Sequence, residues 1–170
     1  MKNFLFLISV LLVSVSFGQT AEEYSHQGVA KFKLQDYTGA IADFNKAIEL
    51  DPDPADGAVY LIRGFAKFSL QDYKGAIADY TKAIAISPAN ANGFTYFNRG
   101  LAKNNLKDYK GAIIDFNKAI ELNPKDADSY VNRGIAKNSL SDTDGACLDW
   151  NKAGELGESD AYELIEKYCI

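Results

Sequence analysis

The chain has 170 residues, with 18 basic and 23 acidic side chains and a net charge of −5 at pH 7. An acidic chain lacks the basic surface that nucleic acids and anionic membranes require, so neither is expected as a partner. One histidine and two distant cysteines exclude a zinc site of the usual spacing, and no phosphate loop or nucleophile–base motif is present, so no catalytic residue, cofactor or metal is predicted.

Residues 1–18 have the features of a secretory signal peptide. Lys2 gives a positive start, an apolar run over residues 4–17 is interrupted only by serines, and small residues stand where a signal peptidase cleaves. Cleavage is expected between Gly18 and Gln19, which leaves 17 basic and 23 acidic residues and a net charge of −6. An uncleaved membrane anchor is the alternative, but the run is shorter than the ~20 residues that span a bilayer. We therefore expect an exported protein, periplasmic or secreted, whose mature chain is not stably inserted in a membrane.

The rest of the chain repeats one pattern four times. In each copy an aromatic residue precedes a glycine, and an Asp-Tyr-x-Gly-Ala segment or a close variant follows, then an aspartate, an aromatic residue and Lys-Ala or a near match. The glycines are Gly28, Gly64, Gly100 and Gly134, spaced 36, 36 and 34 residues apart. Self-similarity at this period is typical of stacked repeat proteins.

Each repeat is predicted to form two antiparallel helices. Apolar residues recur at intervals of three and four around each glycine and again in segments such as 40–48, which gives each helix one buried face. The glycine and an alanine twelve residues later have little or no side chain, so the helices can approach closely there. A tyrosine four residues before the glycine and an aromatic residue sixteen after it would fill the space beside this crossing. An aspartate before the second helix is a good N-cap in every copy: Asp36, Asp72, Asp108 and Asp142.

This order of aromatic residue, Gly, Ala, aromatic residue, Ala and Pro resembles the tetratricopeptide repeat family from residue 21 to about 157. The resemblance implies an all-α, right-handed helical-repeat solenoid of four helix-turn-helix repeats, at about residues 21–54, 55–90, 91–124 and 125–158. Residues 160–168 are amphipathic and are expected to form a C-terminal capping helix, which completes a domain over residues 19–170.

Charged residues at fixed offsets suggest a link between repeats. The residue before the glycine is arginine in the last three repeats, Lys167 holds the equivalent place in the capping helix, and an aspartate stands fifteen residues after each glycine. We expect ion pairs across the junctions: Asp43 with Arg63, Asp79 with Arg99, Asp115 with Arg133, and Asp149 with Lys167. Such pairs would fix the register of the repeats. A basic strip that binds an acidic partner is the alternative.

The two cysteines lie near the end of the chain. Cys147 falls in the second helix of the fourth repeat, and Cys169 follows the capping helix. In an oxidising compartment a disulfide between them would stabilise the fold by ~3 kcal/mol. Two unpaired cysteines are the alternative, because the sequence does not determine the distance between their Cα atoms.

The resemblance places the first helix of every repeat on the concave side of the stack, where family members bind their partners. Apolar and aromatic residues gather in the middle of this face. The candidate peptide-binding residues are Leu61, Phe65, Phe68, Phe94, Phe97, Leu101, Asn104 and Asn138, with Asn98, Asn105 and Asn132 as further hydrogen-bonding groups. Whether the aromatic side chains are exposed or are buried against neighbouring helices stays open. Some family members hold a C-terminal carboxylate with lysines on this side, but Ser25, Leu61, Phe97 and Val131 stand at those positions, so this recognition is not expected.

The resulting hypothesis is a non-enzymatic adaptor or assembly factor of the cell envelope that binds a protein or peptide on its concave face. The main alternative is a self-associating structural module, in which the same face packs against a second copy to give a homo-oligomer. A small-ligand or glycan carrier would need a closed pocket, and a hydrolase has no supporting motif.

Overall fold

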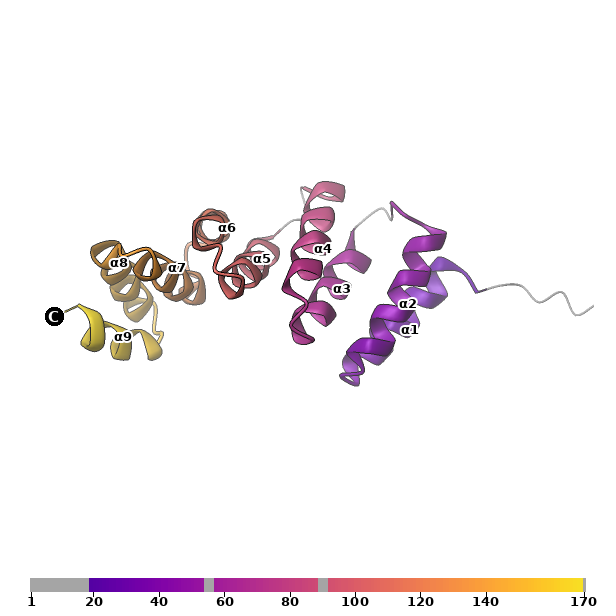
Figure 1. The fold of residues 1–170 in the computed structure, drawn as a ribbon, viewed down its shortest axis with the longest axis horizontal. Helices are drawn as coiled ribbons and strands as arrows, with labels where there is room; N and C mark the ends of the chain where they lie inside the picture. The colour runs from indigo at the N-terminus through magenta and orange to yellow at the C-terminus, as the bar shows by residue number, and fades with distance from the viewer. Residues whose placement is uncertain (1–18, 54–56, 89–91, 170) are drawn as a thin grey trace, which may run out of the picture.

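The computed structural model describes residues 19–53, 57–88 and 92–169, and within these ranges the chain is helical apart from short turns (Figure 1). The described helices are α1 (Ala21–Lys33), α2 (Tyr37–Leu50), α3 (Ala58–Ser69), α4 (Tyr73–Ile86), α5 (Gly93–Asn105), α6 (Tyr109–Leu122), α7 (Ala127–Ser139), α8 (Thr143–Glu155) and α9 (Asp160–Tyr168). The predicted signal peptide, residues 1–18, lies outside these ranges. No helix in the described part of the chain combines the length and the apolar character needed to cross a membrane.

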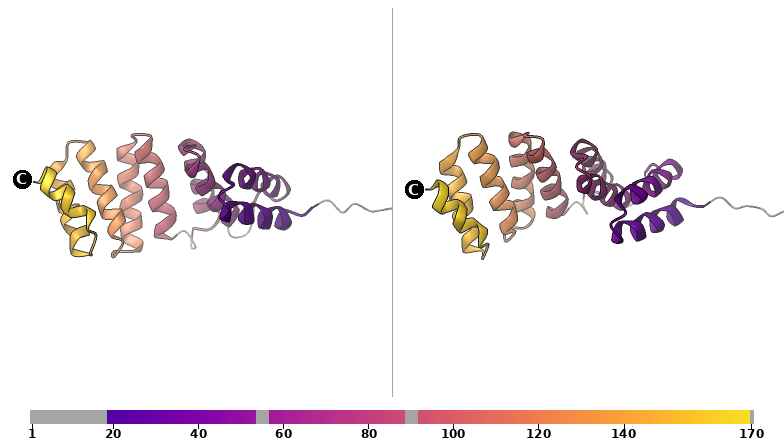
Figure 2. Two further views of the ribbon diagram at one scale, coloured as in Figure 1. Left: turned by 90° about the horizontal axis from the view of Figure 1, so that it is seen from below. Right: turned by 60° about the horizontal axis from the view of Figure 1, so that its bottom comes forward.

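The first eight helices form four antiparallel pairs, α1 with α2, α3 with α4, α5 with α6 and α7 with α8, and α9 packs against α8. Figures 1 and 2 show an elongated stack that runs from α1 and α2 at one end to α9 at the other. This arrangement confirms the all-α repeat solenoid predicted from the sequence, with four helix pairs and a capping helix.

The helices of each pair touch at the repeated glycine. A Cβ atom on Gly100 would lie only 2.7 Å from Cε1 of Phe116, so the ring occupies the space of the missing side chain. The other three glycines meet equivalent aromatic residues in the same way: Gly28 with Phe44, Gly64 with Tyr80 and Gly134 with Trp150. These four aromatic side chains are almost completely buried and form the core of their repeats. The close approach of the two helices that was predicted at the glycine is confirmed.

The second helix of each repeat is capped at its N-terminus by the predicted aspartate. The carboxylates of Asp36, Asp72, Asp108 and Asp142 each accept a hydrogen bond, at 2.9 to 3.0 Å, from the backbone N–H of the glycine three residues later. A Cβ atom on this glycine would overlap the carboxylate, as at Gly39 beside Asp36. The four N-caps are therefore confirmed. Because the glycine of the Asp-Tyr-x-Gly segment has no side chain, the aspartate carboxylate can approach its backbone N–H closely enough for this hydrogen bond.

The ion pairs predicted between repeats are wrong. Each arginine pairs with the aspartate of its own repeat, Arg63 with Asp79, Arg99 with Asp115 and Arg133 with Asp149, with an Nη2–Oδ1 distance of 2.6 Å in every case. The reason lies in the helix crossing. The glycine contacts the aromatic residue sixteen positions later, so the residue before the glycine meets the residue before that aromatic ring. Asp43 pairs with Lys31 at 2.7 Å, and Lys167 lies over the Tyr168 ring.

Each arginine nevertheless links two repeats through a different bond. Its Nη1 donates to a side-chain oxygen in the preceding repeat, from Arg63 to Asn45, from Arg99 to Thr81 and from Arg133 to Asn117, at 2.7, 3.2 and 2.7 Å. A lysine four residues after the arginine binds the same aspartate, as Lys103 binds Asp115 at 2.7 Å. The buried carboxylate is therefore neutralised within its own repeat, and the arginine contacts the preceding repeat through a hydrogen bond to a neutral group.

The capping helix is tied to the last repeat at its far end. A disulfide joins Cys147 in α8 to Cys169 immediately after α9, with the Cα atoms 5.8 Å apart. The rings of Trp150 and Tyr168 lie 5.6 Å apart beside it, and Ala161 at the start of α9 is fully buried. The disulfide that the sequence left open is present in the structure.

Candidate functional site

The first helices of the four repeats, α1, α3, α5 and α7, form what we call the leading-helix face. Within it α1 contacts α3 and α5 contacts α7, although each is separated from the other by a complete second helix in the sequence. Contact between alternate elements is expected along the inner side of a curved stack. The leading-helix face therefore corresponds to the side on which the sequence placed the candidate peptide-binding residues.

The candidate residues differ in how far they are exposed. Phe94, at the start of α5, is 56% exposed and is the most accessible aromatic side chain among them. The others are half-buried: Leu61, Phe65, Phe68, Phe97, Leu101, Asn104 and Asn138. The aromatic residues on this face therefore contribute to the packing of the repeats and also leave part of their surface open.

Phe65 of α3 and Phe94 of α5 form a continuous aromatic seam with Tyr80 of α4. The Phe65 ring lies 5.5 Å from the ring of Tyr80, in an edge-on arrangement, and 5.3 Å from the ring of Phe94 in the next repeat. Phe97 packs on the buried ring of Phe116 at 5.9 Å. Because Phe65 and Phe97 rest on core rings, their orientation is fixed before any partner arrives. Phe68 lies apart from this seam, edge-on to Tyr73 at 5.3 Å.

The asparagines are less available to a partner than the sequence suggested. Asn98, Asn105 and Asn132 each donate their side-chain N–H to the backbone carbonyl four residues earlier in their own helix. Asn138 accepts a hydrogen bond from the Thr143 hydroxyl at 3.1 Å. The side-chain oxygen of Asn104 is buried and has no hydrogen-bond partner in the described structure. The leading-helix face thus offers a partner mainly aromatic and apolar surface.

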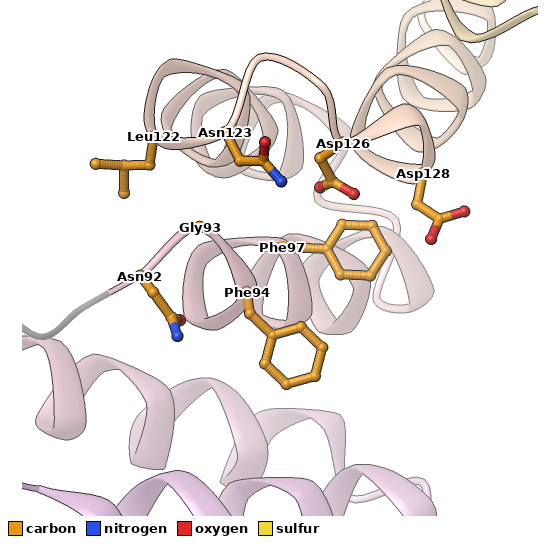
Figure 3. A pocket seen from close by; sticks show the side chains of 8 residues that line it. All are labelled: Asn92, Gly93, Phe94, Phe97, Leu122, Asn123, Asp126 and Asp128. Atoms are coloured by element: carbon orange, nitrogen blue, oxygen red, sulfur yellow. The ribbon is translucent and has the colours of Figure 1, made fainter. Parts of the chain in front are cut away.

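A pocket of about 350 Å³ opens where the third and fourth repeats meet (Figure 3). It lies between the start of α5, the end of α6 and the start of α7, and its lining residues are Asn92, Gly93, Phe94, Phe97, Leu122, Asn123, Asp126 and Asp128. In the view of Figure 3 the Phe97 ring lies between the Phe94 ring and the carboxylates of Asp126 and Asp128. Two of the candidate aromatic residues therefore share a pocket with two acidic side chains.

The sequence reasoning missed both acidic residues of this pocket. Asp128 stands six residues before its glycine, at the position that Phe94 holds in the preceding repeat, so comparing that position between repeats would have found it. Asp126 immediately precedes α7, and its carboxylate accepts a hydrogen bond from the Ser129 hydroxyl. Burial raises the pKa of the Asp128 carboxyl above its ordinary value, and the negative charges of Asp126, Glu158 and Asp160 raise it further.

The arrangement is suited to binding. Aromatic rings supply apolar contact area, and the two carboxylates supply hydrogen-bond acceptors and negative charge. Within the described ranges, His, Cys, Asp and Glu side chains form no group of three or more that could hold a metal ion.

Comparisons with known proteins agree with this architecture. Models of the tetratricopeptide repeat match residues 21–54, 64–106, 94–126 and 116–148, which together make up more than half of the chain. No curated protein sequence matches it. Among solved structures, residues 41 to the end of MamA from Desulfovibrio magneticus RS-1 are 24% identical with a TM-score of 0.74, covering 80% of this chain and 75% of that one.

Two further structures extend the comparison. A crystal structure of MamA is 25% identical with a TM-score of 0.75, covering 84% of this chain and 81% of that one. The tetratricopeptide repeat domain of Arabidopsis OM64 is 29% identical with a TM-score of 0.63, covering 69% of this chain and 94% of that one. The repeat models and the shared fold lead to one conclusion: the chain belongs to the tetratricopeptide repeat family, whose stacked repeats are protein–protein interaction modules.

Proposed function

We propose that this protein is a non-enzymatic adaptor or assembly factor of the cell envelope that binds a protein or peptide through its leading-helix face. The observation that carries the proposal is the aromatic seam formed by Tyr80, Phe65 and Phe94, in which Phe94 keeps 56% of its surface exposed. The proposal of a non-catalytic role is based on a sequence without a nucleophile–base motif.

An exposed aromatic side chain that rests on a rigid core is well suited to anchor a partner. Large rings contribute most of the binding energy at many protein interfaces, and little conformational entropy is lost when their orientation is already fixed. Phe94 meets both conditions, since its ring lies 5.3 Å from Phe65, which in turn packs on the fully buried Tyr80. A partner that covers Phe94 would therefore gain apolar contact at a small entropic cost.

Two features support the proposed location of the protein in the cell envelope. Residues 1–18 have the composition of a signal peptide, and a disulfide joins Cys147 to Cys169, a bond that persists in oxidising compartments. Intact-mass measurement of the protein recovered from an envelope or secreted fraction tests this part of the proposal. The expected chain begins at Gln19, whereas a chain that keeps residues 1–18 and remains in the cytoplasm would contradict export.

Site-specific photo-crosslinking in living cells tests the binding face. A photoreactive phenylalanine analogue at position 94 is expected to crosslink to a partner protein. Ile114 is the matched control, because it is an exposed apolar side chain, 67% accessible, on the second helix of the same repeat. The same analogue at position 114 should give no such adduct.

Two outcomes would overturn the proposal. Equal adducts from positions 94 and 114 would mean that the leading-helix face has no special role. Adducts at position 94 that contain only a second copy of this chain would show self-association and would replace the adaptor model with a structural one.

A further inference from the structure

The lysine and arginine side chains of α3, α5 and α7 all form ion pairs within the protein. The charged side chains of α3, α5 and α7 are Arg63, Lys67, Arg99, Lys103, Asp128, Arg133 and Lys137. Every lysine and arginine in this set lies 2.6 to 2.8 Å from a carboxylate oxygen of a buried aspartate on the second helix of its repeat. Within the described chain, Asp128 is the one charged side chain of these three helices that forms no ion pair or hydrogen bond through its carboxylate.

Asp128 therefore brings an unbalanced negative charge to the pocket that it shares with Phe94 and Phe97. The surrounding charge has the same sign, since Asp126 lines the pocket, and Glu158 in the turn before α9 and Asp160 at the start of α9 also act on Asp128. A ligand that brings a positive charge would relieve this repulsion, and an anionic ligand would increase it.

Within the described ranges, three arginines and Lys82 each lie over a tyrosine ring while binding a carboxylate. The guanidinium of Arg99 lies 5.5 Å from the centre of the Tyr96 ring while its nitrogens bind both oxygens of Asp115, at 3.0 and 2.6 Å. Arg63 and Arg133 repeat this arrangement in their own repeats. A planar guanidinium can stack on a ring and bind a carboxylate through two parallel hydrogen bonds, which an ammonium group cannot do.

The pocket presents the same two kinds of group, aromatic rings and a carboxylate, and no cation is among its lining residues. We propose that it binds an arginine side chain of the partner protein, which extends along the rings of Phe94 and Phe97 and pairs its guanidinium with Asp128. This inference rests on the proposed function, since it names the chemistry by which the leading-helix face recognises its partner. The acidic net charge of the chain, −5, favours the approach of a basic segment.

Titration of the purified protein with N-acetyl-arginine amide, followed by nitrogen–proton correlation NMR, tests the pocket without knowledge of the partner. Saturable shifts are expected at backbone amides of residues 93–97, 123 and 125–129. The citrulline derivative has nearly the same shape without the charge and should give no saturable shift there. The lysine derivative should bind more weakly than the arginine derivative. Equal binding of all three compounds, or shifts spread evenly over the molecule, would overturn the proposal.

Two substitutions separate the charge from the ring. Asp128→Asn and Phe94→Ala are each expected to raise the Kd for the arginine derivative by about fivefold. Glu22→Gln is the matched control, because Glu22 stands at the same position of the first repeat, six residues before Gly28, and also loses one exposed negative charge. An unchanged Kd in Asp128→Asn, or an equal rise in Glu22→Gln, would contradict a specific pocket. The spectra themselves show whether each variant is folded.

The outcomes for the pocket and for the proposed function can be told apart. Saturable binding of the arginine derivative at the pocket, with no protein crosslinked at position 94, would support the pocket and refute the adaptor role. A partner that is crosslinked at position 94 and binds Asp128→Asn as well as it binds the native protein would support the adaptor role and refute arginine recognition.

Discussion

Replacing Tyr80 with phenylalanine removes a single buried oxygen atom. The Tyr80 side chain is 0% exposed, and its hydroxyl has no hydrogen-bond partner in the described structure. The other repeats avoid this situation at the same position, because Phe44 and Phe116 have no polar atom and Trp150 donates its indole N–H to the carbonyl of Val131 at 3.2 Å. Tyr80→Phe is therefore expected to stabilise the protein.

The expected gain follows from the cost of burying a hydroxyl group without a partner. That cost is about 1–3 kcal/mol, and phenylalanine keeps the ring contacts with Gly64 and Phe65. We expect Tyr80→Phe to raise the free energy of unfolding by about 1 kcal/mol or more, which corresponds to a rise in Tm of roughly 2–4 °C for a chain of this size. Urea and thermal denaturation monitored by circular dichroism measure both quantities.

The reverse substitution in the next repeat is a matched control. Phe116 is also 0% exposed and also packs against its glycine, Gly100, so Phe116→Tyr should bury a hydroxyl and lower the stability by a similar amount. A loss of stability in Tyr80→Phe, or no change in either variant, would show that the hydroxyl is satisfied by water or by local movement, and would refute the reasoning.

Alkaline pH gives an independent check. Burial, and then the charge of Asp79, raises the pKa of Tyr80 above its ordinary value. Once the pH exceeds the unfolded pKa of about 10, the unfolded chain releases this proton while the folded chain keeps it, so stability decreases as the pH rises. The native protein should therefore lose stability above pH ~10 more steeply than Tyr80→Phe, in which the other tyrosines are unchanged.

Four other substitutions test the packing of the repeats. Asp115→Asn leaves two largely buried cations without their anion and should lower the free energy of unfolding by about 3 kcal/mol. In Asp43→Asn only a single half-exposed lysine loses its partner, so the loss should be under about 1 kcal/mol. Urea denaturation of both variants measures the difference, and equal losses of stability would contradict it. Gly100→Ala brings a Cβ atom to 2.7 Å from the Phe116 ring and should destabilise by about 1–3 kcal/mol, and unchanged thermal unfolding would mean that the ring can shift freely. Cys147→Ser should accelerate hydrogen exchange of amides in α9 more than in α1, because the disulfide to Cys169 holds the capping helix; uniform exchange would refute that role.

The features that the sequence predicted correctly depend on short distances along the chain. The Asp36 cap and the contact between Gly28 and Phe44 are determined by residues within one helix pair, so a repeated spacing is enough to identify them. The pairing of Arg63 could not be chosen by spacing alone. Asp43 and Asp79 occupy the same offset in their repeats, and only the crossing of the two helices at Gly64 decides between them.

The pocket could not be predicted from the spacing of residues along the sequence, for a different reason. Its walls come from the start of α5, the end of α6 and the start of α7, so its shape depends on how the third and fourth repeats are placed against each other. Phe94 and Phe97 were found because aromatic residues on a leading helix are conspicuous. Asp126 and Asp128 resembled ordinary polar residues at a helix start, and only the structure brings them to those rings.

The way the arginines are paired also affects how the stack responds to force. The buried opposite charges meet inside each helix pair, and Arg99 reaches the preceding repeat only through a hydrogen bond from Nη1 to Thr81 at 3.2 Å. The ion pair that crosses the first junction, between Asp53 and Lys82, is exposed. A change in the angle between two repeats therefore stretches a bond to a neutral group and leaves the buried carboxylate with its cations. We expect the solenoid to bend at its junctions while every helix pair stays rigid, so that the curvature of the leading-helix face can adjust to the length of the segment it holds.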